Sequence, residues 1–419
     1  MSPSLSLSRV SRTFRTLVHR KKGPKETISS SPLCNLPREL LLGISTFLNS
    51  SSLCSLRLTC KLLYDLTLPQ FGQKYLETVK TDLSLASLQR LDTLSKDVRL
   101  CPHVRSLCID GTDEDVLGSG LEWERNASEL VITSQESVQR WQDTLLRLGN
   151  CQSFHLHKHF TTDSPRPANI LTPCDTVTIF FGIIAAIERP LRELSILFKP
   201  PNCTGANRID MSRVDKGLLR EPKFITTCSS LEALAFTFAM ETDDEVDFVI
   251  ELLRHAPHLQ RLRIDADYGD HSTTLMSRLY SSQLTFSLRE LTLETAHIGS
   301  ADALNEFLAS FEHSLAKVSF AAIHIDSGEW ASVFRNLSKF PSLTDVSTYF
   351  LGQAGSQRIH FPAVLQDPVV DPVLRTKFSY TVKKFRQGQR TLVVSYSGPG
   401  IDIALEKLAA YATHYSLTG

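Results

Sequence analysis

A six-residue pattern of apolar and polar positions, apolar–x–x–apolar–x–apolar, returns along most of the chain. Its copies begin at Val104, Cys151, Leu191, Leu231, Leu259, Leu288, Leu315 and, more weakly, Leu343. From Leu231 onward the copies start 28, 29, 27 and 28 residues apart. A constant period of this length indicates a stack of similar units, each burying its apolar side against its neighbours.

The segments between the later copies carry a helical pattern. Residues 243–258 begin with acidic residues and place Val246, Val249, Ile250 and Leu253 on one face, as expected of an amphipathic helix. Residues 300–314, which open with a serine cap, and residues 327–340 repeat this arrangement. Strands therefore alternate with helices along the chain.

This alternation and its period are similar to those of the leucine-rich repeat. The resemblance implies an α/β solenoid over residues 78–350, with parallel strands on the concave face and helices on the convex face. The earlier copies lie 47, 40 and 40 residues apart, which leaves room for inserted loops at residues 111–120 and 199–217. Residues 351–419 predict a C-terminal cap, with two strands around a Gly-containing turn in 376–398 and a helix in 400–415.

Side chains between the apolar positions of each strand are expected on the concave face. They are Ser153, His155, His157, Glu193, Ser195, Arg261, Arg263, Asp265, Glu290, Thr292, Glu294, Lys317 and Ser319. We take the following as the candidate target-binding residues: His155, His157, Glu193, Arg261, Arg263, Glu290 and Glu294. Adjacent strands would set the two arginines beside Glu290 and Glu294, where opposite charges can pair. The face is either a ligand surface or a self-neutralised solvated surface.

Residues 31–66 form a separate, leucine-rich segment with three expected helices. Asn35 is a possible N-cap, with Pro37 in the first turn. The first helix carries an apolar stripe of Leu40, Ile44, Phe47 and Leu48, widened by Leu41, before residues 49–52 break it. Leu53, Leu56 and Leu58 mark the second helix, Leu62, Leu63 and Leu66 mark the third, and Pro69 marks its end. Such broad apolar faces on so small a unit suggest a partner-binding surface.

This segment resembles an F-box. The matching positions are Leu33, Leu36, Pro37, Glu39, Leu40, Ile44, Leu48, Leu53, Leu56, Arg57, Cys60 and Leu63. The resemblance implies an F-box at residues 31–77 that docks onto a Skp adaptor, which in turn joins a cullin–RING ubiquitin ligase, the SCF complex. The adaptor-binding residues it implies are Leu33, Leu36, Pro37, Glu39, Leu40, Ile44, Leu48, Leu53 and Leu56. Gly43 departs from the pattern and costs about 1 kcal/mol of helix propensity relative to alanine.

Composition and charge narrow the range of functions. Lys and Arg total 45 and equal the 45 Asp and Glu, which argues against a nucleic-acid partner. The longest apolar run, residues 176–187, is shorter than the roughly 20 residues of a membrane span. Nine cysteines without a CxxC pair favour reduced thiols in the cytoplasm or the nucleus. The basic residues 1–30 are expected to be disordered, with a transit peptide and a nuclear signal at residues 19–25 as alternatives.

The sequence offers no motif of an enzyme. It contains neither GxSxG nor HExxH, and residues 397–405 lack the lysine of a phosphate-binding loop. His155, His157 and His159 alternate along one strand and could hold zinc, but no Cys or acid stands nearby at ligand spacing. We therefore expect no metal ligand and no cofactor.

The F-box resemblance and the repeat pattern together imply a non-catalytic, target-recognition subunit of an SCF-type ubiquitin ligase. The layout of F-box, irregular repeats and strand–strand–helix tail is similar to that of fungal F-box proteins. Two alternatives stay open. One is a leucine-rich-repeat scaffold with no ligase role. The other is a repeat protein in which Leu36, Pro37, Leu40 and Ile44 are buried against the first repeats.

Overall fold

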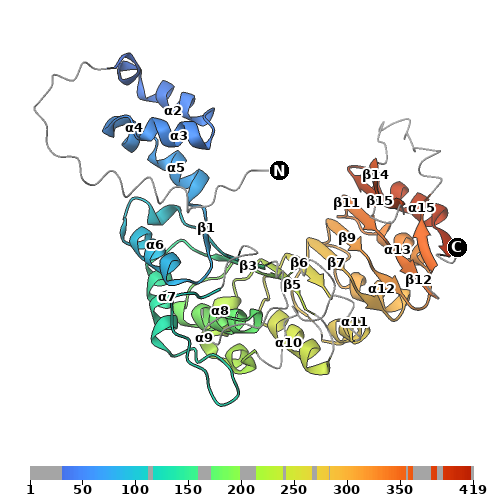
Figure 1. Cartoon of the computed structure of the whole chain (residues 1–419). Coiled ribbons are helices and arrows are strands. Elements are labelled where there is room, and N and C mark those ends of the chain that lie inside the picture. Colours follow the sequence, from blue (N-terminus) through green and yellow to red (C-terminus); the bar gives the residue numbers. More distant parts are fainter. Residues whose placement is uncertain are drawn as a thin grey trace, which may run out of the picture.

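Figure 1 shows the computed structural model of the chain. It describes residues 31–111, 117–158, 171–198, 214–238, 242–266, 271–282, 284–354, 357–361, 379–384 and 390–416. The predicted disordered tail at residues 1–30 lies outside the described residues, as do His159, residues 112–116 of the first predicted inserted loop and residues 199–213 of the second.

The first described residues form a small helical unit. Its elements are η1 (Pro32–Asn35), α2 (Arg38–Thr46), α3 (Ser50–Arg57), α4 (Lys61–Leu66) and α5 (Leu68–Tyr75). The three predicted helices are present, and the Asn49 side chain caps α3 by accepting a hydrogen bond from the Ser52 amide. One detail of the prediction is wrong: Pro37, not Asn35, is the N-cap of α2. The third helix ends at Leu66, before Pro69 as expected, and Pro69 itself lies in the first turn of α5, a helix that was not predicted.

A long sheet follows the helical unit. Its parallel strands are β1 (Thr78–Thr81), β2 (Ser106–Gly111), β3 (Ser153–Lys158), β4 (Glu193–Phe198), β5 (Ala233–Thr237), β6 (Arg261–Asp265), β7 (Glu290–Glu294), β9 (Lys317–Ala321) and β11 (Asp345–Tyr349). Each strand pairs in parallel with the next one in this order. All eight predicted copies of the apolar pattern lead into one of these strands, two residues after the copy begins.

The first strand, β1, was missed by the sequence analysis. It is preceded by Leu76 and contains Val79 and Thr81, which occupy the three apolar positions of the pattern. Thr81 replaces an apolar residue there and is nevertheless buried. Its hydroxyl accepts a hydrogen bond from the Leu83 amide, which satisfies a polar group that burial would otherwise penalise.

Helices cover the outer side of the sheet, which curves into an arc with the strands lining its inner side (Figure 1). They are α6 (Leu85–Lys96), α7 (Glu136–Arg147), α8 (Pro173–Ile187), α9 (Pro222–Cys228), α10 (Asp243–Arg254), α11 (Ser272–Ser281), α12 (Ala301–Ala309) and α13 (Trp330–Leu337), with 3-10 turns η2 (Cys101–His103) and η5 (Lys216–Arg220). All residues of α8 except Ala186 are buried. No helix in the described part of the chain is long and apolar enough to cross a membrane.

The core lies between the strand layer and the helix layer. Alternate strand residues such as Leu234 and Phe236 are fully buried. Aromatic rings from neighbouring units also meet there, as where Phe181 of α8 lies edge to face with Phe224 of α9, with centroids 5.3 Å apart. Units that share their core in this way stabilise one another rather than folding separately.

A second, smaller sheet was not predicted. It has the order β16-β13-β12-β10-β8, with β8 (His297–Ile298), β10 (His324–Ile325), β12 (Gly352–Gln353), β13 (Gln357–His360) and β16 (Thr413–Ser416). The chain turns from β7, β9 and β11 into β8, β10 and β12 through a left-handed residue, which is Thr295, Ala322 or Phe350 respectively. The same left-handed backbone conformation recurs in three successive units, so it is a regular part of the connection between the two sheets.

The C-terminal segment completes both sheets. The predicted strand pair is present as β14 (Ser379–Lys384) and β15 (Arg390–Ser397), and β15 runs antiparallel to β11. The predicted helix is α15 (Ile401–Tyr411), but residues 413–416 form β16 instead of its last turn. Because β12, β13 and β16 extend the sheet begun by β8 and β10, the predicted boundary at residue 351 is not a break in the structure.

The helical unit is joined to the sheet by a shared core. Leu53 of α3, Phe71 of α5 and Leu76 belong to the same buried cluster as the strands. Arg57 is also buried, and its guanidinium carbon lies 4.1 Å from the Phe71 ring centroid and 4.3 Å from that of Tyr64. Such cation–π contacts stabilise a buried guanidinium.

Candidate partner-binding surfaces

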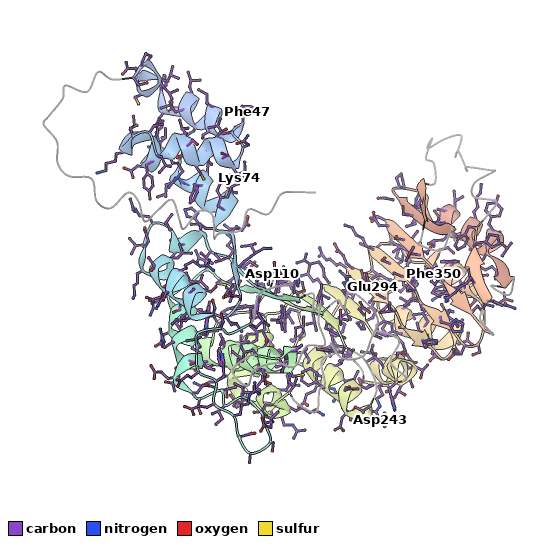
Figure 2. The ribbon with its side chains drawn as sticks, in the orientation of Figure 1. Phe47, Lys74, Asp110, Asp243, Glu294 and Phe350 are labelled. Carbon is purple, nitrogen blue, oxygen red and sulfur yellow. The ribbon has the colours of Figure 1, made fainter. Side chains whose placement is uncertain are left out.

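The helical unit carries an uncovered apolar face. The side chains of Leu36, Leu40, Ile44 and Phe47 are 37%, 55%, 42% and 90% exposed. They follow one another along η1 and α2 with the spacing of one helix face. Figure 2 labels Phe47 on this unit and Lys74 nearer to the sheet domain. An exposed apolar group of this kind typically marks a surface for another protein.

The opposite side of α2 forms the small core of the unit. Leu41 is 4% exposed and packs with Leu63 and Leu66, and Leu33, Cys34, Leu42, Leu56 and Cys60 pack around them. Leu41, which only widened the predicted stripe, is thus the main core residue of α2. The inner face therefore forms the core of the unit, and the outer face is left accessible to a partner.

The structure divides the residues predicted to bind an adaptor into three groups. Leu36, Pro37, Glu39, Leu40 and Ile44 are exposed, Leu33, Leu48 and Leu56 are half-buried, and Leu53 is buried. Leu53 is 1% exposed because it packs into the main core, so its predicted role as a contact residue is wrong.

The alternative in which this face is buried against the first repeats is also wrong, because Leu36, Pro37, Leu40 and Ile44 are all exposed. Phe47 was part of the predicted stripe but was not among the predicted site residues. Its position one turn after Ile44, on the same helix face, is the sequence signal by which Phe47 could have been included in the site.

The second candidate surface is the concave face of the sheet. At its N-terminal end the ammonium of Lys80 on β1 lies 2.6 Å from the Asp110 carboxylate on β2. On β3, the His155 and His157 rings lie 5.5 Å apart, and His157 Nε2 is 3.0 Å from the Ser195 hydroxyl of β4. Burial lowers the pKa of both histidines, so their rings are neutral at pH 7.

The middle of the concave face holds ion pairs. Arg263 lies 2.8 Å from Glu294, as predicted, but Arg261 does not pair with Glu290. Arg261 reaches back across β5 to Glu193 at 3.8 Å, and Glu290 pairs with Lys317 at 3.6 Å. The predicted neighbours were correct, and the choice of partner depends on side-chain reach, which strand register alone does not determine.

A shallow pocket lies among these charges. Its floor is formed by Ala233 and Ala235 of β5, and its walls include Glu193, Arg261 and Arg263 from the strands on either side. The small alanines leave space that the longer side chains around them surround. Glu294 and Asp110, labelled in Figure 2, both lie along the strand layer on this inner side of the arc.

A row of hydroxyl side chains crosses the C-terminal half of the face. Thr292 of β7, Ser319 of β9, Ser347 of β11 and Ser395 of β15 are aligned by the register of their strands. Together with Tyr396 and neighbouring residues they line a second pocket. The concave face therefore offers paired charges at its centre and small polar groups beside them.

The fold and its two surfaces define a multi-unit α/β protein with a small helical unit packed ahead of its first strand. Comparison with known families identifies that unit: an F-box-like domain matches residues 33–70. No curated protein matches the chain. The match supports the predicted F-box over residues 33–70, and F-box domains generally bind Skp-type adaptors.

Proposed function

We propose that this chain is the target-recognition subunit of an SCF-type ubiquitin ligase. Its F-box would dock a Skp adaptor, and through it a cullin–RING ligase, while the concave face of the sheet holds a target protein. The observation that carries the proposal is the exposed face of Leu36, Leu40, Ile44 and Phe47 inside the F-box-like domain. Burying such a face against an adaptor removes apolar surface from water and favours binding.

We further propose that the strand–helix units are leucine-rich repeats of an irregular, fungal type. The period of 27–29 residues between Leu231 and Leu343, and the parallel one-after-another strand order, support this proposal. A repeat array offers an extended concave surface for another protein. We place the target on His155, His157, Glu193, Arg261, Arg263, Glu290 and Glu294.

In this role the chain acts without bond chemistry of its own, in the cytoplasm or the nucleus. Leu53, Phe71 and Leu76 tie the docking unit to the sheet through one shared core. A target bound on the sheet is therefore held at a fixed distance from the adaptor. Fixed proximity raises the effective concentration of a target lysine at the ubiquitin-transferring partner.

The test is a binding measurement between the full chain and a purified Skp adaptor. Ile44→Ala should weaken binding about tenfold, because a residue near the centre of an interface is placed like a hot spot and a loss of about 1.4 kcal/mol corresponds to a factor of ten. Ile403→Ala on α15 is a matched control, since Ile403 is 44% exposed against 42% for Ile44. Equal affinities of the two variants, or no binding by the wild type, would refute the adaptor proposal.

A scaffold without a ligase role remains the alternative for a chain that does bind the adaptor. It is distinguished by following a bound target in cells while cullin activity is inhibited. Under our proposal the target becomes longer-lived on inhibition, whereas a target whose lifetime does not change would favour the scaffold.

A further inference from the structure

Two histidines and one aspartate from successive units meet on the second sheet. His297 lies on β8 and His324 on β10, and the two residues are direct partners in the parallel register. Asp326 follows β10 by one residue. Among the residues that the structure describes, these three form a group whose possible ligand atoms all lie within 4.8 Å of one another.

The possible ligand atoms lie close together. Asp326 Oδ1 is 3.9 Å from His297 Nδ1 and 3.7 Å from His324 Nε2, and the imidazole centroids are 5.2 Å apart. A tetrahedral zinc ion with bonds of about 2.0–2.1 Å to nitrogen and oxygen holds neighbouring ligands about 3.3 Å apart. The two His–Asp distances are close to this spacing and all three ligand atoms lie within 4.8 Å of one another, so side-chain movements of about 1 Å or less would complete the coordination.

The backbone beneath the group is fixed. The His324 amide donates to the Ala296 carbonyl and the Asp326 amide donates to the Ile298 carbonyl, both at 2.9 Å. The His297 amide donates to the hydroxyl of the buried Ser272 at 3.0 Å. A pre-organised backbone lowers the entropy that metal binding must overcome.

Gly352 gives the His324 ring its space. A Cβ at Gly352 would lie 2.5 Å from His324 Nδ1, so a side chain there would displace the ring. With Nδ1 against β12, the other ring nitrogen, Nε2, is the one that faces Asp326. Asp326 is 49% exposed, which leaves the group open to an ion from solvent.

We propose that His297, His324 and Asp326 form a binding site for a divalent transition-metal ion, with zinc as the expected occupant. Two imidazoles and one carboxylate are a ligand set that zinc accepts, and three protein ligands leave a fourth position for water. The ion would link two successive units of the second sheet, and ligand binding to the folded state alone raises its stability.

One nearby charge opposes the ion. The Arg358 guanidinium stacks over the Phe350 ring at 4.2 Å, and its Nη1 is 3.1 Å from the Cβ position of Gly352, beside His324. Its positive charge weakens cation binding, and Asp326 compensates for it within the group. Replacing Arg358 should therefore tighten metal binding. A His–Asp cluster with a purely structural role would show no such change.

The test uses the full chain and calorimetric titration with zinc, supported by the visible spectrum of the cobalt-loaded protein. Wild type should bind one equivalent of zinc that the variants His324→Ala and Asp326→Asn either do not bind or bind at least about tenfold more weakly. Arg358→Gln should bind it more tightly. His313→Ala, which removes an exposed histidine outside the group, should match wild type.

His324→Gln keeps the size of the side chain, and its metal-free melting temperature checks that the fold is intact. Equal zinc binding by wild type and by folded His324 variants would overturn the proposal. So would a wild-type chain that binds no zinc in the titration.

Discussion

The guanidinium of Arg125 donates two parallel hydrogen bonds to the carboxylate of Asp175, from Nη1 to Oδ1 at 2.9 Å and from Nη2 to Oδ2 at 2.7 Å. Asp175 is only 2% exposed and lies in the first turn of α8. Its Oδ2 also accepts a hydrogen bond from the Thr172 amide at 2.7 Å, within a capping box. The pair thus fixes the segment before α7 to the start of the buried helix.

Arg125→Ala should therefore lower the free energy of unfolding by about 3 kcal/mol, because it leaves a buried carboxylate without its partner. Arg220→Ala is the control: Arg220 is 79% exposed beside Glu251, and surface pairs contribute about 0–1 kcal/mol. Urea unfolding of both variants measures the difference. Similar losses for the two would show that the Arg125 pair does not stabilise the fold.

Acid should destabilise the fold through the concave histidines. Burial holds the pKa of His155 and His157 below the ordinary value of about 6.5, with Glu193 and Asp110 respectively opposing the shift. As pH falls through 6.5 the unfolded chain takes up protons before the folded chain does, so the free energy of unfolding decreases. Above pH 7 this decrease in the free energy of unfolding is absent.

Replacing both His155 and His157 by glutamine should flatten the decrease in unfolding free energy between pH 7 and pH 5. Urea midpoints measured across this range test the expectation, with His313→Gln as an exposed control. If the double variant and wild type keep parallel pH profiles, these rings do not contribute to the acid sensitivity.

The cysteines should differ widely in reactivity. Burial raises the pKa of Cys151 and Cys228 to about 12 and that of Cys108 to about 11. The pKa of Cys60 is lowered because the Leu63 amide hydrogen-bonds its sulfur, and the Cys34 sulfur lies 3.7 Å away. The thiolate is the reactive form, so accessible thiols with a low pKa react first.

Iodoacetamide at pH 7.5, read by peptide mass spectrometry, should therefore modify Cys60 well before Cys151, Cys228 or Cys108. Urea should abolish the difference, because unfolding exposes every thiol. Early modification of Cys151 or Cys228 in the native protein would contradict the burial of these residues.

The central ion pair of the concave face should contribute little to stability. Arg263 and Glu294 are 32% and 20% exposed, and a partly solvated pair of this kind couples by about 1 kcal/mol or less. A double-mutant cycle with Arg263→Ala and Glu294→Ala measures the coupling. A coupling above about 2 kcal/mol would make the pair a structural element and weaken its assignment to a target surface.

The regular features of the fold were predictable because each depends on local pattern. The eight strands and the helices at residues 243–258 and 300–314 follow from the spacing of apolar residues and from caps at Thr242 and Ser300. The strand β1 was missed because Thr81 stands at an apolar position, and only its hydrogen bond to Leu83 explains its burial.

The apolar stripe of the F-box-like domain was also predictable, but which of its residues are buried and which are exposed was not. Helical spacing places Leu40 and Leu41 on one broad face, and only packing against Leu63 and Leu66 makes Leu41 core and leaves Leu40 exposed. Leu53 was wrongly placed at the surface for the same reason, since the core it enters belongs to the sheet domain.

By itself the sequence determined the alternation of strands and helices, the repeat period and the location of the helical unit, because apolar periodicity and capping act over a few residues. The tertiary structure alone determined which residues of different units contact one another. The pairing of Arg261 with Glu193, the second sheet, and the meeting of His297 with His324 and Asp326 all depend on contacts between units some 27 or more residues apart. Such contacts are set by the curvature and register of the stacked units, which no local pattern records.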